Sequence, residues 1–145
     1  MSSNVRLMAC SPNDVFAVLA DGWLYPSWVV GASRMRDVEE AWPAEGSRLH
    51  HSFGVWPMLL NDETVVREWD PPRRAVISPK GWPVGEALVT IEVRPRTTGC
   101  IVRIQEKAQK GPATLLPSPM LDIYLHARNV ETLRRLAFIA EGRAA

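Results

Sequence analysis

Three side chains of this 145-residue chain combine acid–base chemistry with apolar neighbours: His51, Glu106 and His126. A histidine titrates near neutral pH, and a carboxylate removed from water changes its pKa readily. Together, two histidines and one carboxylate are also a donor set known from non-haem iron sites. Which of these chemistries is open to them depends on the faces of the elements that carry them.

The pair His50–His51 lies in a segment of alternating character, Gly46 to Pro57. A period of two predicts a half-buried strand whose successive side chains point to opposite faces. His51 has the parity of the apolar residues Leu49, Phe53 and Val55. We therefore expect His51 to face the interior and His50 to face solvent, so that the two cannot share an ion. His51 has two possible roles: a ring satisfied by a neighbouring hydroxyl or carbonyl, or a hydrogen-bond partner of a ligand.

Glu106 and His126 occupy comparable positions in the last strand and the last helix. Glu106 shares a strand face with Val102, Ile104 and Ala108. Because a buried carboxylate is costly unless it is paired, hydrogen-bonded or protonated, Glu106 either meets a ligand or, near the strand end, reaches solvent or pairs with a basic side chain. His126 falls in an apolar helical stripe, where an interior histidine satisfied by its neighbours is the alternative to a binding role.

The elements that position these residues follow from periodicity and punctuation. Residues 4–10 predict a strand, Ser11–Asp21 predict a helix with Pro12 at its first position, and Pro26 limits a second helix to a short one. Turns rich in Pro and Gly separate six further predicted strands: 33–40, 47–56, 59–69, 73–79, 86–95 and 99–109. A long helix over about 119–141 follows, with a predicted inward stripe of Ile123, His126, Ala127, Val130, Leu133, Ala137 and Ala140.

Short connections imply an antiparallel meander, and only the last helix is large enough to cover its apolar face. The pattern therefore predicts one α+β domain over 1–145 whose sheet curls around that helix. A hydrophobic content of 46% supports a substantial core. The 17 basic residues are scattered and nearly balance 16 acidic ones, which argues against nucleic acid as a partner.

No segment has the length of an apolar membrane span, and the first residues do not form a signal peptide, so we expect no membrane span and a cytoplasmic location. Cys10 and Cys100 lack metal-ligand spacing and are expected as free thiols. Nucleophile-elbow, phosphate-loop and dinucleotide-binding motifs are missing. We therefore expect no cofactor and assign no catalytic residue.

Three segments, in this order, resemble the START-like or Bet v 1-like superfamily, and within it the bacterial SRPBCC polyketide cyclase/dehydrase family: SPNDVFAVLADGWLYPSWVVGA, EWDPPRRAV and RNVETLRRLAFIAEG. The resemblance covers the whole chain. It implies a helix-grip fold, in which a curved seven-stranded antiparallel sheet wraps around the long C-terminal helix. In that topology Cys10 and Cys100 become neighbours. The strands of His51 and Glu106 stand roughly 19 Å apart along the sheet, so no metal is expected.

The resemblance also implies a cavity between sheet and helix, in the usual range of ~300–1,000 Å³. Its expected lining is His51, Phe53, Val89, Ile91, Val102, Ile104 and Glu106 from the sheet, Met120, Ile123, His126 and Ala127 from the helix, and Trp28 and Trp56 near the mouth. Members of the family include lipid carriers, plant-metabolite binders and aromatase/cyclases.

We expect the chain to bind or carry a small hydrophobic or amphipathic molecule, lipid- or polyketide-like, as a monomer or a homodimer. One alternative is a cyclase/dehydrase-type enzyme, in which a cavity histidine or carboxylate moves a proton next to a carbonyl. Another is an interaction protein that uses the face of the sheet.

Overall fold

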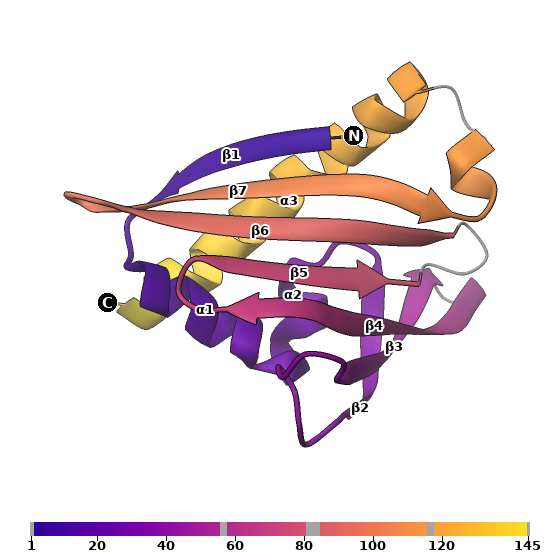
Figure 1. Ribbon diagram of the computed structural model, residues 1–145, viewed down its shortest axis with the longest axis horizontal. Helices are drawn as coiled ribbons and strands as arrows, with labels where there is room; N and C mark the ends of the chain where they lie inside the picture. The colour runs from indigo at the N-terminus through magenta and orange to yellow at the C-terminus, as the bar shows by residue number, and fades with distance from the viewer. Residues whose placement is uncertain (1, 56–57, 81–84, 116–117, 145) are drawn as a thin grey trace.

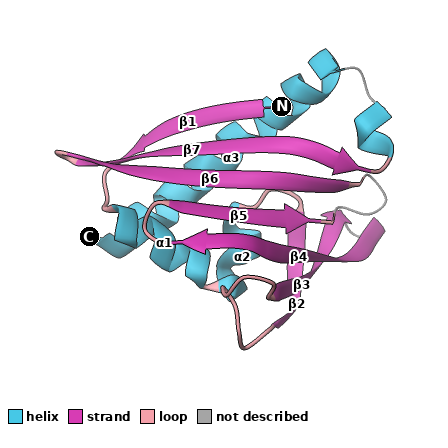
Figure 2. Cartoon of the chain, in the orientation of Figure 1, coloured by secondary structure: helices cyan, strands magenta, loops and turns pink. Residues whose placement is uncertain are grey.

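A computed structural model describes residues 2–55, 58–80, 85–115 and 118–144. A seven-stranded antiparallel sheet, in the order β1-β7-β6-β5-β4-β3-β2, carries the helices on one side, as Figure 1 shows. The strands are β1 (Ser2–Met8), β2 (Ala32–Val38), β3 (Arg48–Val55), β4 (Met58–Asp70), β5 (Arg74–Pro79), β6 (Glu86–Arg96) and β7 (Gly99–Lys110). The helices are α1 (Pro12–Ala20), α2 (Tyr25–Trp28) and α3 (Ser118–Ala144), with short turns η1 (Gly22–Leu24) and η2 (Pro112–Leu115). The predicted order of elements is confirmed (Figure 2).

The N-terminal end of α1 is fixed by reciprocal bonds between Ser11 and Asp14. The amide of Asp14 donates to Ser11 Oγ at 3.2 Å, and the amide of Ser11 donates to Asp14 Oδ2 at 2.9 Å. This capping box satisfies two amides that a helix end otherwise leaves without partners. At the other end, the side chain of Asp21 accepts from the amide of Trp23 at 3.2 Å and starts η1. The chain thus turns directly into α2, the short helix that places Tyr25 against the sheet.

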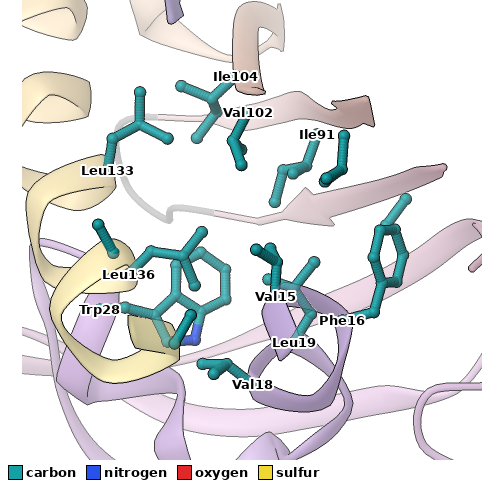
Figure 3. Packing of buried hydrophobic residues seen from close by; sticks show 14 of the residues in the cluster. Val15, Phe16, Val18, Leu19, Trp28, Ile91, Val102, Ile104, Leu133 and Leu136 are labelled. Atoms are coloured by element: carbon teal, nitrogen blue, oxygen red, sulfur yellow. The ribbon is translucent and has the colours of Figure 1, made fainter. Parts of the chain in front are cut away.

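The apolar core lies between the sheet and the helices, and Figure 3 shows its part around α1 and the C-terminal half of α3. Alternation in β6 and β7 turns Ile91, Val102 and Ile104 toward this core. Their partners are Val15, Phe16, Val18 and Leu19 from α1 and Leu133 and Leu136 from α3. Burial of this set provides the main driving force for folding.

The face that α3 turns toward the sheet is only partly the predicted one. Leu133, Ala137 and Ala140 are buried as predicted, but Val130 is 49% exposed and Ile123 is 71% exposed. The buried residues of α3 are Leu125, Asn129, Thr132, Leu133, Leu136, Ala137 and Ala140. The predicted stripe is therefore wrong in the N-terminal half of the helix. It followed apolar residue types, whereas this half buries the polar side chains of Asn129 and Thr132.

Three more residues of the predicted inward helix lining, Met120, His126 and Ala127, are exposed. They lie on the faces of α3 that its inward stripe leaves to solvent. No helix in the described ranges is both long enough and apolar enough to cross a membrane.

Cys10 and Cys100 are buried neighbours with free thiols. The strand register pairs Met8 with Cys100, which brings the end of β1 to the start of β7. Burial, and then the adjacent Cys100 thiol, raise the pKa of Cys10 to about 12, and burial also raises the pKa of Cys100. Because the thiolate is the reactive form, these cysteines are poor nucleophiles at neutral pH.

Candidate functional site

Buried polar side chains gather at one end of the interior, beside members of the apolar core. On β3 and β4 the register places His51 opposite Asp62, and on β6 and β7 it places Val89 opposite Glu106. Both pairs lie toward the end of the sheet where β5 and β7 finish, at the right in Figure 1. His51, Asp62 and Glu106 are all buried. A buried polar group at this position needs a partner, so the interior contacts decide what the site can do.

The centre of this region is the hydroxyl of Thr64, which joins two titratable side chains. Its Oγ1 lies 2.9 Å from Tyr25 Oη and 2.9 Å from His51 Nε2. The rings of Tyr25 and His51 stack with their centroids 5.2 Å apart. All three side chains are buried, and His51 is only 1% exposed. His51 is thus satisfied at Nε2 by a neighbouring hydroxyl, which is one of the two predicted roles.

The opposite orientation of the two adjacent histidines is confirmed. His50 lies on the outer face, where its ring is 3.6 Å from Glu39 and 3.8 Å from Glu63, while His51 is enclosed. The predicted parity of β3 is therefore right, and a slip by one residue would have exchanged the two rings.

Neither Tyr25 nor Thr64 was recognised from the sequence. Tyr25 begins α2, and Trp28 at the end of this helix packs against it edge-on at 5.4 Å. Thr64 pairs with Leu49 on β3, two residues from the partner of His51. Because threonine is a common strand residue, its type alone carries no functional information. The register does pair His51 with Asp62, and the alternation along β4 puts Thr64 on the same face as His51.

Both rings bonded to Thr64 are uncharged at neutral pH. Burial, and then the cationic Arg36, lower the pKa of His51 to about 4, although the backbone of Ser52 opposes them. Arg36 lies close because its Nε donates to the His51 carbonyl at 3.2 Å. Burial raises the pKa of Tyr25 to about 12, against the effects of the Thr64 bond and of Arg128. The group therefore acts through neutral hydrogen bonds.

Glu106 forms a buried ion pair with Arg128 of α3. Arg128 Nη1 donates to Glu106 Oε2 at 2.9 Å, and its Nε donates to the carbonyl of Val30 at 3.0 Å. The side chains are 5% and 15% exposed. The two possibilities for Glu106 are thus decided in favour of a basic partner. Both charges act on the pKa of Tyr25, which Arg128 lowers and Glu106 raises.

His126 has a separate role at the junction of α3 and β1. Its Nδ1 lies 3.0 Å from Asn4 Nδ2, which also donates to the His126 carbonyl at 3.3 Å. Ser2 Oγ donates in turn to Asn4 Oδ1 at 3.1 Å. His126, exposed and bonded to β1, therefore fastens the helix to the edge of the sheet. Within the described ranges, no three His, Cys, Asp or Glu side chains form a group suited to a metal ion.

Two buried polar atoms are left without a hydrogen-bond partner among the described residues: His51 Nδ1 and Asn129 Nδ2. Asn129 is 2% exposed and lies on the inward face of α3. An unmet buried donor or acceptor costs ~1–3 kcal/mol, so such atoms require an explanation. The Asn129 amide can donate to an oxygen, and His51 Nδ1 can donate or accept according to its tautomer.

A small apolar cavity adjoins the Thr64 group. It has a volume of about 10 Å³, room for about one water molecule, and is lined by Leu19, Tyr25, Trp28, Trp42, Trp69, Ala75, Ile77 and Ile91. Trp28, expected near a cavity mouth, is instead buried here. Trp56 and the side chain of Phe53 lie outside the described part of the chain, so their place in a pocket of ~300–1,000 Å³ stays a prediction.

The remaining residues of the predicted lining belong to the sheet. Val89, Ile91, Val102 and Ile104 are buried on the concave face of the sheet, in line with Glu106. The sheet residues thus point where the alternation predicted, and their contact with a ligand stays a prediction.

Comparison with known proteins agrees with this architecture. A family model described as "Polyketide cyclase / dehydrase and lipid transport" matches residues 2–141. Protein NE0264 from Nitrosomonas europaea has a similar structure, with 16% sequence identity over 97% of this chain and 94% of that chain and a TM-score of 0.74. For Ara h 8.0201 the identity is 11%, the coverage 95% of each chain and the TM-score 0.72. No curated protein matches the sequence.

The di-domain ARO/CYC StfQ from the steffimycin biosynthetic pathway is also similar, with 17% identity and a TM-score of 0.75. The match covers 98% of this chain and 50% of StfQ, so this chain corresponds in length to half of that protein. At these identities the structures establish the fold alone, whereas the family match spans nearly the whole sequence. The chain belongs to the SRPBCC family of polyketide cyclase / dehydrase and lipid transport proteins and has the Bet v 1-like helix-grip fold, as its sequence predicted.

Proposed function

We propose that the chain binds a small, largely apolar molecule that carries a carbonyl or hydroxyl oxygen. The observation that carries this proposal is the pair of unmet buried atoms, His51 Nδ1 and Asn129 Nδ2. Hydrogen bonds to ligand oxygens would recover the cost of burying them. The family, described by polyketide cyclases, dehydrases and lipid transport, supports a ligand of this class.

The walls for the apolar part of the ligand come from the concave face of the sheet. Val89, Ile91 and Ile104 line this face and are buried in the described structure. Burial of apolar ligand surface contributes ~25 cal/mol per Å², so the affinity rests mainly on this part. The hydrogen bonds then fix which end of the ligand lies next to His51.

The polar end of the ligand is expected to be uncharged. Arg128, a cation on the inner side of α3, is already paired with Glu106 at 2.9 Å. A ligand carboxylate would have to displace Glu106 and leave its charge buried without a partner, which is costly. A ketone, aldehyde or alcohol avoids that cost.

A cyclase/dehydrase-type activity is the second candidate, favoured by the shared contacts of Tyr25 and His51 with Thr64. A chain of hydroxyl and imidazole groups can pass a proton. General acid–base catalysis works best when the pKa of the catalytic group lies near the working pH. The pKa values of about 4 for His51 and about 12 for Tyr25 lie far from it, so binding is the stronger proposal.

The test compares ligands that differ in one polar group. A fluorescent apolar probe is titrated into the protein and displaced by a long-chain ketone or by the hydrocarbon of equal length. We expect the ketone to displace the probe at a concentration roughly tenfold lower, since one satisfied buried group is worth ~1 kcal/mol or more. The variant His51→Phe should lose this preference and still bind the hydrocarbon.

The matched control is His50→Phe, which alters the neighbouring ring on the outer face. It should keep the preference for the ketone. Equal displacement by ketone and hydrocarbon in the unmodified protein would contradict the proposed anchor. A poly-β-ketone substrate consumed by the unmodified protein but not by His51→Phe would establish the enzymatic alternative.

A further inference from the structure

Helix α3 has a second apolar face, which points away from the sheet. Among the side chains of this helix that the structure describes, five large apolar ones are exposed, to between 49% and 79%: Met120, Ile123, Tyr124, Val130 and Phe138. At about 100° per residue, Met120 and Phe138 point in the same direction, roughly 180° from the buried Asn129. Because Asn129 is buried while Met120 and Phe138 are exposed, this face is on the side of α3 away from the sheet, behind which most of the helix lies in Figure 1.

A helix with apolar residues on two opposite faces is normally buried on both. Here only one face has a partner among the described elements, and contiguous exposed apolar surface marks an interaction site. At roughly 100 Å² each, the five side chains supply about 500 Å² of the ~800 Å² per partner of a standard protein interface, and Ala127, Glu131 and Arg134 between them supply further surface.

The residues along this face repeat with the period of a helix-pairing seam. Met120, Tyr124, Ala127, Glu131, Arg134 and Phe138 are separated alternately by four and three residues. They span 18 residues in five steps, a mean spacing of 3.6 residues, so they stay on one face of the helix along its length. Ile123 and Val130 flank the seam on one side and widen its apolar surface.

We infer that this face binds α3 of a second copy of the chain in antiparallel orientation, so that the protein is a homodimer. The seam is self-complementary about its midpoint. In the antiparallel arrangement Met120 of each copy lies beside Phe138 of the other, and Ala127 lies beside Glu131 of the other. The same surface then serves both subunits, as a two-fold symmetric interface requires.

Charge decides between the two orientations. Glu131 accepts from Arg134 at 2.7 Å and from Arg135 at 2.9 Å within one helix. A parallel pair would place Glu131 and Arg134 each beside the same residue of the other copy, and contacts between like charges are unfavourable. The antiparallel pair instead brings Arg134 to the level of Tyr124 of the other copy, within reach of a cation–π contact. The antiparallel pair also sets the two helix dipoles in opposite directions, which is the favourable arrangement.

The first experiment measures association by sedimentation equilibrium between roughly 1 and 200 µM protein. We expect a reversible dimer of the unmodified chain. The variants Phe138→Lys and Met120→Lys should weaken dimerisation at least tenfold and keep the circular dichroism of the folded protein, because both side chains are solvent-exposed in the single chain. Leu7→Lys is the matched control, since Leu7 is an exposed apolar residue of β1 outside the seam.

The second experiment tests the orientation by disulfide cross-linking with diamide, which takes up the two protons and two electrons that leave the thiols. Samples of Met120→Cys and Phe138→Cys are oxidised separately and as a mixture. In the antiparallel pair, position 138 lies roughly 27 Å from its own counterpart at a rise of 1.5 Å per residue, but beside position 120 of the other copy. We therefore expect a covalent dimer only in the mixture.

Several results would overturn the inference. These are a monomer throughout the concentration range, a dimer that persists in Phe138→Lys, or a dimer that only Leu7→Lys disrupts. Cross-links that form equally in the separate samples would exclude the antiparallel arrangement. A monomer that sediments with phosphatidylcholine vesicles would assign the face to a lipid surface in place of a second copy.

Discussion

Tyr25 and His51, 26 positions apart in the chain, stack at 5.2 Å and bond to the same hydroxyl of Thr64 at 2.9 Å each. One hydroxyl carries one proton and offers two acceptor lone pairs, so Thr64 can donate to only one of its two partners. The tautomer of His51 decides whether Thr64 donates to Nε2 or accepts from it. It also sets whether Nδ1, the atom left unmet, is offered to a ligand as donor or acceptor.

Replacement of Thr64 by valine should cost more stability than removal of either outer group. Thr64→Val keeps the shape but leaves Tyr25 Oη and His51 Nε2 both buried without a partner, at ~1–3 kcal/mol each. Tyr25→Phe leaves the bond between Thr64 and His51 intact and should cost about 1 kcal/mol. Urea unfolding of both variants measures the difference. Thr90→Val on β6 is the control, and a smaller loss in Thr64→Val than in Tyr25→Phe would contradict the linked arrangement.

The buried ion pair predicts strong coupling between β7 and α3. Glu106→Gln leaves the charge of Arg128 buried without its counter-ion, and such changes cost ~3–5 kcal/mol. The double variant Glu106→Gln with Arg128→Met removes the charge as well, so it should unfold at a higher urea concentration than Glu106→Gln alone. Asp70→Asn, in the exposed pair with Arg73, should change the midpoint little. Additive losses in the double variant would show that the pair is not coupled.

The depressed pKa of His51 predicts how stability depends on pH. In the folded protein His51 stays neutral down to about pH 4, whereas in the unfolded chain it takes up a proton near pH 6.5. The unfolded state therefore binds more protons between these values, and the stability supplied by the neutral ring is lost as the pH falls from 6.5 toward 4. Between pH 7.5 and 5.5 the free energy of unfolding should fall by roughly 1 kcal/mol.

Urea unfolding at the two pH values measures this loss, and His51→Asn should remove most of it. The interval stays above the range in which the carboxylates titrate, so their protonation contributes little. His50→Asn is the control, because its ring lies on the outer face between two carboxylates. An unchanged pH dependence in His51→Asn would mean that the ring is not desolvated as the structure indicates.

The extent to which the sequence predicted this molecule differs between strands and helix. In strands a period of two leaves only one choice of faces, so the apolar neighbours of His51 identified the inner side. The predicted strands 86–95 and 99–109 correspond closely to β6 (Glu86–Arg96) and β7 (Gly99–Lys110). In α3, apolar residues occupy two opposite faces, and the residue types alone do not show which face meets the sheet. The prediction chose the face of Ile123 and Val130, because the true inward face contains Asn129 and Thr132.

The buried polar contacts of α3 were not predicted from the sequence, for a related reason. Arg128 and Asn129 are adjacent, and neither belongs to the predicted inward stripe of the helix. The structure instead uses Arg128 to neutralise Glu106 and encloses Asn129. A polar residue on an inward face becomes predictable only when its partner is known, and here the partner of Arg128 lies 22 residues earlier on another element.

The proposed binding space can be tested by filling it. Ile104 points to the concave face and is 3% exposed, whereas Ile101, on the same strand, points to the other face. Ile104→Trp should lower the affinity for an apolar fluorescent probe more than tenfold, because the indole occupies volume that the ligand would use. Overfilling of a core costs ~1–3 kcal/mol, so near-ultraviolet circular dichroism must show that the variant remains folded.

Ile101→Trp introduces the same ring on the outer face and should leave probe affinity unchanged. The comparison separates the place of binding from the general effect of a larger side chain on β7. If both variants bind the probe as the unmodified protein does, the ligand lies outside the concave face, and the anchor assigned to His51 fails with it. If only Ile104→Trp loses binding while His51→Phe keeps its preference for a ketone, the apolar walls are correctly placed, and the polar end of the ligand contacts Asn129 in place of His51.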